Sequence, residues 1–216
     1  MQTHQREFIE FAIACDVLRF GDFTLKSGRR SPYFFNTGRF DTGARIGRLG
    51  EFYATAIQAS GIDMDMLYGP AYKGIPLVTA TAIALARLTS AEIPFAFNRK
   101  EAKDHGEGGL LIGAPLKGKV LILDDVITAG TSVRESVDLI RSAGAEPCGV
   151  MIALDREEVG QTAQSAVQEV RERLGIPVHP IITLRDLLEY LEETGNLAAR
   201  TALEQHRSRY GAPAAR

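Results

Sequence analysis

The sequence predicts an α/β fold, with a doubly wound, mostly parallel five-stranded sheet and a small N-terminal hood subdomain. Short apolar runs alternate with segments of helical periodicity from about Met66 onward, which is the pattern of successive βαβ units. The 216 residues are 45% hydrophobic, enough to bury one sizeable core. We therefore expect a single domain over residues 1–216, with the hood at about 1–40 and the core at about 41–216.

The elements follow from apolar periodicity and from the residues that begin or end them. Strands are expected at residues 66–68, 93–97, 120–123, 149–154 and 178–182. Helices are expected at residues 42–60, 75–88, 132–143 and 162–174, and from Thr183 to Gly195. In the N-terminal part, β-type runs at 20–25 and 33–36 flank a polar turn, which predicts a small hairpin outside the main sheet.

A glycine-rich segment interrupts this pattern between Asn98 and Val120. It has no apolar periodicity, carries five glycines, and begins with Arg99, Lys100, Lys103 and His105. Long loops inside a compact domain are usually lids or binding loops, although most charge runs are merely solvated. Because this run follows a strand in a mildly acidic protein, we expect residues 99–118 to form a flexible cationic loop that closes over an anionic ligand.

Composition excludes several classes of function. A net charge of −2 argues against bulk nucleic-acid binding. Two cysteines, and four histidines without ligand spacing, argue against a disulfide framework and a protein-bound transition metal. The first ten residues lack the apolar run of a signal peptide, and no segment approaches the roughly twenty apolar residues of a membrane span. The expected location is the cytoplasm.

The most specific motif is residues 120–132, Val-Leu-Ile-Leu-Asp-Asp-Val-Ile-Thr-Ala-Gly-Thr-Ser. It reads as a buried strand, two acids at the carboxyl end of that strand, and a turn that opens a helix. Ligands of open α/β sheets bind at this edge, where residues 128–132 can wrap a phosphate. Asp124 and Asp125 would repel a phosphate, but they suit sugar hydroxyls or water on a magnesium ion. The motif therefore indicates a phosphorylated ribose.

An isolated Asp-Asp pair would usually be a solvated acid pair beside a helix cap. Here all thirteen positions fit one pattern, and neither a P-loop nor a dinucleotide-binding fingerprint is present in the sequence.

These thirteen residues resemble the phosphoribosyl-pyrophosphate (PRPP) signature of the type I phosphoribosyltransferases. Over nearly its whole length the chain is similar to the bacterial orotate phosphoribosyltransferases, at residues 23–28, 31–36, 69–74, 98–106 and 155–156. The resemblance implies transfer of the ribosyl 5-phosphate group of PRPP to orotate, giving orotidine 5′-phosphate and pyrophosphate, with Mg²⁺ as cofactor. The transition state is expected to be oxocarbenium-like, with the protein supplying positioning and charge stabilisation.

The resemblance also assigns roles to residues of this chain. The implied catalytic residues are Lys103, Asp124 and Asp125. The implied PRPP contacts are Lys26, Tyr72, Lys73, Arg99, Lys100, Lys103, His105, Asp124, Asp125, Val126, Ile127, Thr128, Ala129, Gly130, Thr131 and Ser132. The implied orotate contacts are Lys26, Phe34, Phe35, Thr128 and Arg156. Mg²⁺ is expected to be held mainly by substrate and water, with no protein residue as a metal ligand.

Family members are typically homodimers with shared active sites, so the resemblance also implies a homodimer. Two rival interpretations stay open. A purine phosphoribosyltransferase shares the signature but takes a base without a carboxylate. A regulator could use the same fold to sense PRPP while binding nucleic acid, but no helix-turn-helix precedes the hairpin and the net charge is negative. We expect neither a nucleic-acid nor a membrane partner.

Overall fold

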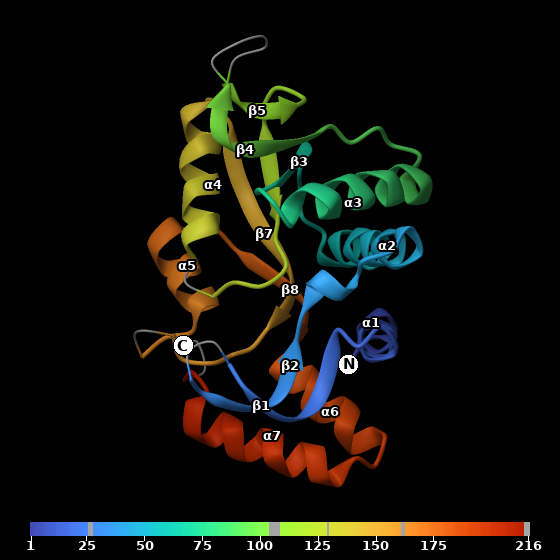
Figure 1. Cartoon of the computed structure of the whole chain (residues 1–216). Coiled ribbons are helices and arrows are strands. Elements are labelled where there is room, and N and C mark those ends of the chain that lie inside the picture. The colour runs from blue at the N-terminus through green and yellow to red at the C-terminus, as the bar shows by residue number, and fades with distance from the viewer. Residues whose placement is uncertain (26–27, 104–108, 129, 161–162, 214–216) are drawn as a thin grey trace.

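A computed structural model describes residues 1–25, 28–103, 109–128, 130–160 and 163–213, without the side chains of residues 102, 103 and 109. Its main sheet has six strands in the order β5-β4-β3-β6-β7-β8 (Figure 1). The strands are β3 (Met66–Gly69), β4 (Phe95–Lys103), β5 (Gly109–Gly113), β6 (Lys119–Leu123), β7 (Glu146–Asp155) and β8 (Val178–Thr183). Neighbouring strands are parallel except for β4 and β5.

Helices cover both faces of this sheet because alternate side chains of each strand point to opposite sides. Leu67 and Leu121 belong to the larger core, beneath α2 (Gly43–Ser60) and α3 (Gly74–Thr89). Tyr68 and Ile122 belong to the second core, beneath α4 (Thr131–Ser142) and α5 (Ala166–Leu174). Figure 1 shows α2 and α3 on one side of the sheet and α4 and α5 on the other.

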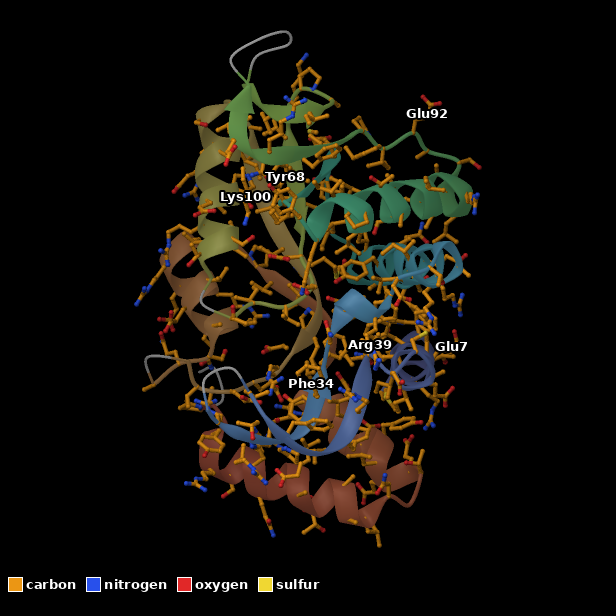
Figure 2. All side chains as sticks on the ribbon, in the orientation of Figure 1. Glu7, Phe34, Arg39, Tyr68, Glu92 and Lys100 are labelled. Atoms are coloured by element: carbon orange, nitrogen blue, oxygen red, sulfur yellow. The ribbon has the colours of Figure 1, made fainter. Side chains whose placement is uncertain are left out.

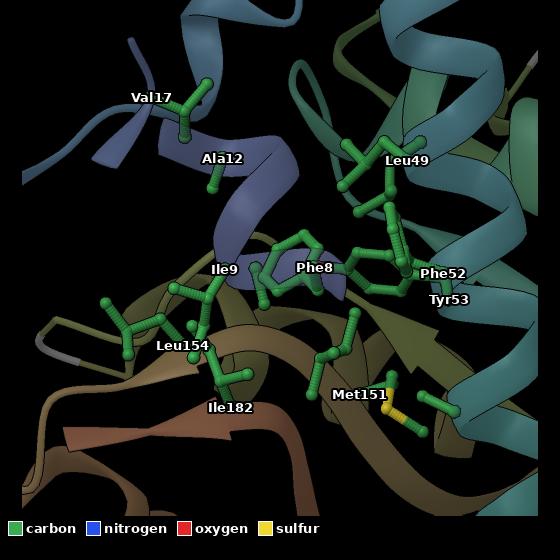
Figure 3. Close-up of a cluster of buried hydrophobic side chains, with 14 of the residues drawn as sticks. Phe8, Ile9, Ala12, Val17, Leu49, Phe52, Tyr53, Met151, Leu154 and Ile182 are labelled. Atoms are coloured by element: carbon green, nitrogen blue, oxygen red, sulfur yellow. The ribbon is translucent and has the colours of Figure 1, made fainter. Parts of the chain in front are cut away.

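The larger core continues beneath the N-terminal helix α1 (Thr3–Ala14). Figure 3 shows Phe8 of α1 meeting Phe52 of α2, with ring centroids 5.3 Å apart in an edge-to-face arrangement. Met151 of β7 and Ile182 of β8 lie below these rings, and both side chains are buried. This packing joins α1 to the main sheet through apolar contacts.

The hood contains an antiparallel hairpin of β1 (Leu18–Thr24) and β2 (Arg30–Phe35), followed by a single 3₁₀ turn at Thr37–Arg39. Two C-terminal helices, α6 (Leu184–Glu193) and α7 (Leu197–Tyr210), lie beside it (Figure 1). Helix α7 contacts β2 and buries Leu203. The hood is therefore built from both ends of the chain.

The expected α/β class, hairpin and strand positions are confirmed, but three details differ. The sheet has six strands rather than five, because Gly109–Gly113 pairs antiparallel with β4. Residues 99–118 are consequently not one loop, since they hold the end of β4 and all of β5. Helix α5 begins at Ala166, later than the expected residue 162, because Ser165 accepts the amide of Gln168 and caps it.

Helices α1 and α7 were not predicted from the sequence. Across the described residues, none of the helices is both long and apolar enough to span a membrane.

Candidate active site

The acid pair lies at the carboxyl end of β6, where Asp124 is 8% exposed and Asp125 is 9% exposed. The carboxylate of Asp124 accepts the amide N–H of Asp125 at 2.9 Å, and that of Asp125 accepts the amide of Val126 at 2.9 Å. From α2, the Tyr53 hydroxyl donates to the backbone carbonyl of Asp124 at 2.7 Å. These bonds hold both acids in place at the edge where a ligand of this fold binds.

Two donors from separate parts of the chain meet Asp125. Lys73 Nζ lies 2.5 Å from Asp125 Oδ2, and the Thr37 hydroxyl donates to the same oxygen at 2.6 Å. Lys73 follows β3, the parallel neighbour of β6, so Lys73 and Asp125 lie at the same edge of the sheet. Thr37 was missed, and its only sequence signal is a hydroxyl directly after the predicted hairpin. Through Thr37 the hood is bonded to the carboxyl edge of the main sheet.

The two carboxyls differ in their pKa values. Burial, followed by the neighbouring charge of Asp125, raises the pKa of Asp124 to about 6. Burial also opposes ionisation of Asp125, but hydrogen bonds from Lys73 and Thr37 outweigh it and lower the pKa of Asp125 below its ordinary value. Asp125 is therefore the firmly ionised member of the pair.

The turn after the acids opens α4 as the sequence predicted. Gly130 is the N-cap residue and has φ +68°, a left-handed conformation that glycine adopts without strain. Thr128, Thr131 and Ser132 are exposed around it, so amides and hydroxyls gather at a helix N-terminus that can hold a phosphate. Val126 and Ile127 pack instead against the two cores, while Ala129 lies outside the described residues.

A second tight turn, residues 69–74, joins β3 to α3. A Cβ atom on Gly69 would lie 2.2 Å from the carbonyl oxygen of Gly74, so any side chain there would force the backbone of the turn to shift. Asn98 of β4 accepts the amide of Ala71 at 2.8 Å, a contact that the sequence did not reveal. The Ala71–Tyr72 peptide bond within this turn is cis.

Two of the expected pyrophosphate contacts lie together beside this turn. Lys100 Nζ is 5.2 Å from the centroid of the Tyr72 ring, and the Tyr72 side chain is exposed. Arg99 precedes Lys100 on β4, whose last residue is Lys103. Figure 2 labels Lys100 in the upper half of the view and Phe34 of the hairpin in the lower half. Lys26, His105 and the side chain of Lys103 lie outside the described part of the chain.

The expected base-binding residues are only partly brought together. Phe34 and Phe35 are successive residues of β2, so their side chains point to opposite faces of the hairpin. Phe34 lies beside Phe23, with ring centroids 5.6 Å apart, whereas Phe35 packs against the larger core. The Arg156 guanidinium lies over the ring of Tyr33, 4.4 Å from its centroid.

A cavity of about 400 Å³ lies directly beside Asp125. Its lining includes Thr37, Phe40, Tyr53, Lys73 and Asp125. This volume is within the usual range of small-molecule sites, and its walls combine apolar rings with a few charged groups.

Comparison with known proteins identifies the family. Residues 38–173 match the phosphoribosyl transferase domain family. Over 211 residues the chain is 69% identical to a protein of Methylococcus capsulatus named orotate phosphoribosyltransferase, covering 98% of this chain and 99% of that relative. The chain belongs to the orotate phosphoribosyltransferase family. An orotate phosphoribosyltransferase of Thioalkalivibrio sulfidiphilus is 60% identical over 98% of this chain and 100% of that relative.

Solved structures of orotate phosphoribosyltransferases share this fold as well. The crystal structure of the Francisella tularensis enzyme is 41% identical, with a TM-score of 0.88 over 95% of this chain and 100% of that chain. The resemblance inferred from the thirteen-residue signature is thereby confirmed. The roles of individual residues stay predictions, which the geometry above supports to different degrees.

Proposed function

We propose that this chain transfers the ribosyl 5-phosphate group of PRPP to N1 of orotate, giving orotidine 5′-phosphate and pyrophosphate in pyrimidine biosynthesis. The observation that carries the proposal is the buried acid pair, bonded to Lys73 and Thr37 and followed by a glycine-capped helix N-terminus. A carboxylate pair for a sugar diol beside a phosphate turn matches a phosphorylated ribose. The relatives' shared name supplies the choice of orotate.

In this proposal, different residues bind different parts of PRPP. Asp124 and Asp125 accept hydrogen bonds from the ribose hydroxyls, and the exposed turn at Thr128, Thr131 and Ser132 holds the 5-phosphate. Lys73 and the cations of β4 meet the pyrophosphate, where negative charge grows as the bond from the anomeric carbon breaks. The protein thus positions both reactants and stabilises the leaving group.

The same geometry is compatible with Mg²⁺ bound together with the substrate. Within the described residues, no group of three His, Cys, Asp or Glu side chains could hold a metal ion. Mg²⁺ commonly keeps several waters and binds one or two carboxylates together with substrate phosphates. We propose that PRPP and water hold most of its coordination shell and that Asp124 and Asp125 face that shell. When bound, it would neutralise charge on the pyrophosphate.

A homodimer and a cytoplasmic location are also proposed, from family resemblance. Sedimentation at micromolar concentration should then give twice the 23.5 kDa chain mass.

Turnover by the purified protein tests the proposed activity. Pyrophosphate release from PRPP and Mg²⁺ should require orotate, and adenine or hypoxanthine should not replace it. Release with a purine alone would instead identify a purine phosphoribosyltransferase. Binding of PRPP without turnover of any of these bases would favour a sensor.

A further inference from the structure

A buried carboxylate lies beneath the residue expected to bind the orotate carboxylate. The side chain of Glu158 is 8% exposed. Its Oε1 atom is contacted by Arg156, by the Tyr33 hydroxyl at 3.0 Å and by His206 Nε2 at 3.1 Å, while Arg29 reaches Oε2 at 3.2 Å. These partners come from the hairpin, the segment after β7 and helix α7. Glu158 therefore joins three separate parts of the chain.

The bonds to Glu158 fix one edge of the Arg156 guanidinium. Nε and Nη2 of Arg156 lie 3.1 and 2.9 Å from the same oxygen of Glu158, and Nη2 also reaches the Ser31 hydroxyl at 3.4 Å. The Tyr33 ring lies against the guanidinium, 4.4 Å from ring centroid to Cζ. Among the described residues, Nη1 of Arg156 has no acceptor. The unoccupied edge is thus the one available to a ligand.

The charges of this cluster favour a single added carboxylate. Arg156 and Arg29 bring two positive charges, and Glu158 brings one negative charge. Burial opposes ionisation of Glu158, but Arg156 and His206 more than offset it, so the pKa of Glu158 is lowered and the group is ionised at neutral pH. Two arginines without Glu158 would repel each other in a partly buried site.

We propose that Glu158 is a positioning residue for the base: it holds Arg156 so that its free Nη1 edge meets the carboxylate of orotate. The inference rests on the proposed function, which places orotate at Arg156. Planar guanidinium groups bind carboxylates best in a fixed orientation, and an unrestrained arginine loses rotamer freedom when it binds. Glu158 restrains the Arg156 side chain before orotate binds, so little further rotamer freedom is lost on binding. Tyr33 and His206 in turn hold Glu158 in place.

Glu158→Gln is the informative substitution, because it keeps the side chain's size but weakens its bonds to the arginines. We expect the KM for orotate to rise at least fivefold while the KM for PRPP changes less than twofold. Glu157→Gln is the matched control, since it makes the same change at the next residue, whose carboxylate pairs with Arg185 at 3.9 Å instead. That control should leave both KM values within twofold of the unsubstituted protein.

A double-mutant cycle distinguishes positioning through Arg156 from a separate effect. Arg156→Ala should raise the KM for orotate at least tenfold, and adding Glu158→Gln should raise it no further. If the two effects multiply, or if Glu158→Gln leaves or lowers the KM for orotate, the positioning role is wrong. If Arg156→Ala affects both substrates equally, this inference and the placement of Arg156 both fail, although orotate turnover would still support the proposed activity.

If Glu158→Gln does not fold, a less disruptive substitution still tests the inference. Tyr33→Phe removes one hydrogen bond to Glu158 and keeps the ring beneath Arg156. It should raise the KM for orotate about two- to fivefold, again without changing that for PRPP. An equal rise for both substrates would overturn the inference.

Discussion

Lys73 Nζ lies 2.5 Å from Oδ2 of Asp125, so an ion pair joins the turn after β3 to the acid pair after β6. The lysine side chain is 61% exposed, whereas that of Asp125 is 12% exposed. The exposed end of the pair therefore faces solvent, and the buried end is held by Thr37 as well. If an anionic ligand draws Lys73 away, the lysine exchanges the carboxylate of Asp125 for the ligand. Asp125 keeps its position, because Thr37 still donates to it.

Asp125→Asn should preserve the fold and lower kcat/KM by roughly 10- to 100-fold, because hydrogen bonds to a charged acceptor contribute about 1.5–3 kcal/mol. Steady-state kinetics with orotate and PRPP measure the effect. The matched control is Asp63→Asn, which removes an aspartate that also lies 2.5 Å from a lysine, Lys119, but is 81% exposed. Similar activity in the two variants would contradict the site assignment of Asp125.

Asp124 should make stability depend on pH. Its pKa is raised from 3.8 to about 6, so its contribution to stability is present at acidic pH and is lost as the pH rises through about 6. Asparagine resembles the protonated acid and escapes this loss. The free energy of unfolding of Asp124→Asn, relative to that of the unsubstituted protein, should therefore be higher at pH 8 than at pH 4, by at most about 3 kcal/mol. Urea unfolding at both pH values measures this gain, and a constant difference would refute the raised pKa.

Gly69→Ala should distort the turn that carries Lys73. Its new Cβ would meet backbone atoms of Gly74, at 2.2 Å from the oxygen and 2.7 Å from the carbonyl carbon. Overpacking of this kind costs about 1–3 kcal/mol, and we expect weaker PRPP binding as well. Gly47→Ala in α2 is the control, because its Cβ would meet nothing within 4 Å. Helix propensity predicts that the control gains about 0.5–1 kcal/mol.

The predicted closing of residues 99–118 over PRPP can be followed by hydrogen exchange. Strand β5 is at the sheet edge, and its register with β4 is irregular between Asn98 and Lys103. We expect the amides of 99–103 and 109–113 to gain protection with PRPP and Mg²⁺. Those of central strand β6 serve as an internal reference and should change little. Equal protection of both segments with and without ligand would contradict a closing loop.

Mixing two variants of strongly reduced activity tests whether the loop acts on the neighbouring subunit. Nine residues of β4, at about 3.3 Å each, span roughly 30 Å, so Lys103 can lie far from Phe95. If Lys103 serves the partner's site, exchanging subunits between Lys103→Ala and Asp125→Asn dimers should restore roughly a quarter of the sites. Activity that stays at the parental level despite demonstrated subunit exchange would reject sharing, without affecting the proposed reaction.

The sequence predicted those parts of the site that depend on local pattern. The strand before Asp124 and the turn at Gly130 were predictable because a short apolar run, two acids and a glycine are contiguous. Strand β5 was missed because Leu110, Leu111 and Ile112 are a short apolar run among glycines. Its pairing with β4 depends on a partner strand that periodicity alone does not identify.

Contacts between distant segments could not be predicted from pattern. Thr37, Tyr53 and Asn98 reach the site from a 3₁₀ turn, a helix and a strand, and each is an ordinary polar residue in its local sequence. Helix α7 carries Leu203 and His206 as its buried residues, too few to give a clear apolar stripe. Its role becomes visible only once the chain ends are brought together.

Because Glu158 joins α7 to the hairpin, the two halves of the proposed site are completed at different times during synthesis of the chain. One half is the turn after the acid pair, and the other is the cluster around Glu158. Ser132 is the last residue of the proposed phosphate-binding turn, and His206 follows it after roughly 4–15 s of further translation. Until then the first-made hairpin has no α7 to pack on β2, and Glu158 lacks one of its partners. We therefore expect the proposed base site to be completed later in synthesis than the proposed phosphate site.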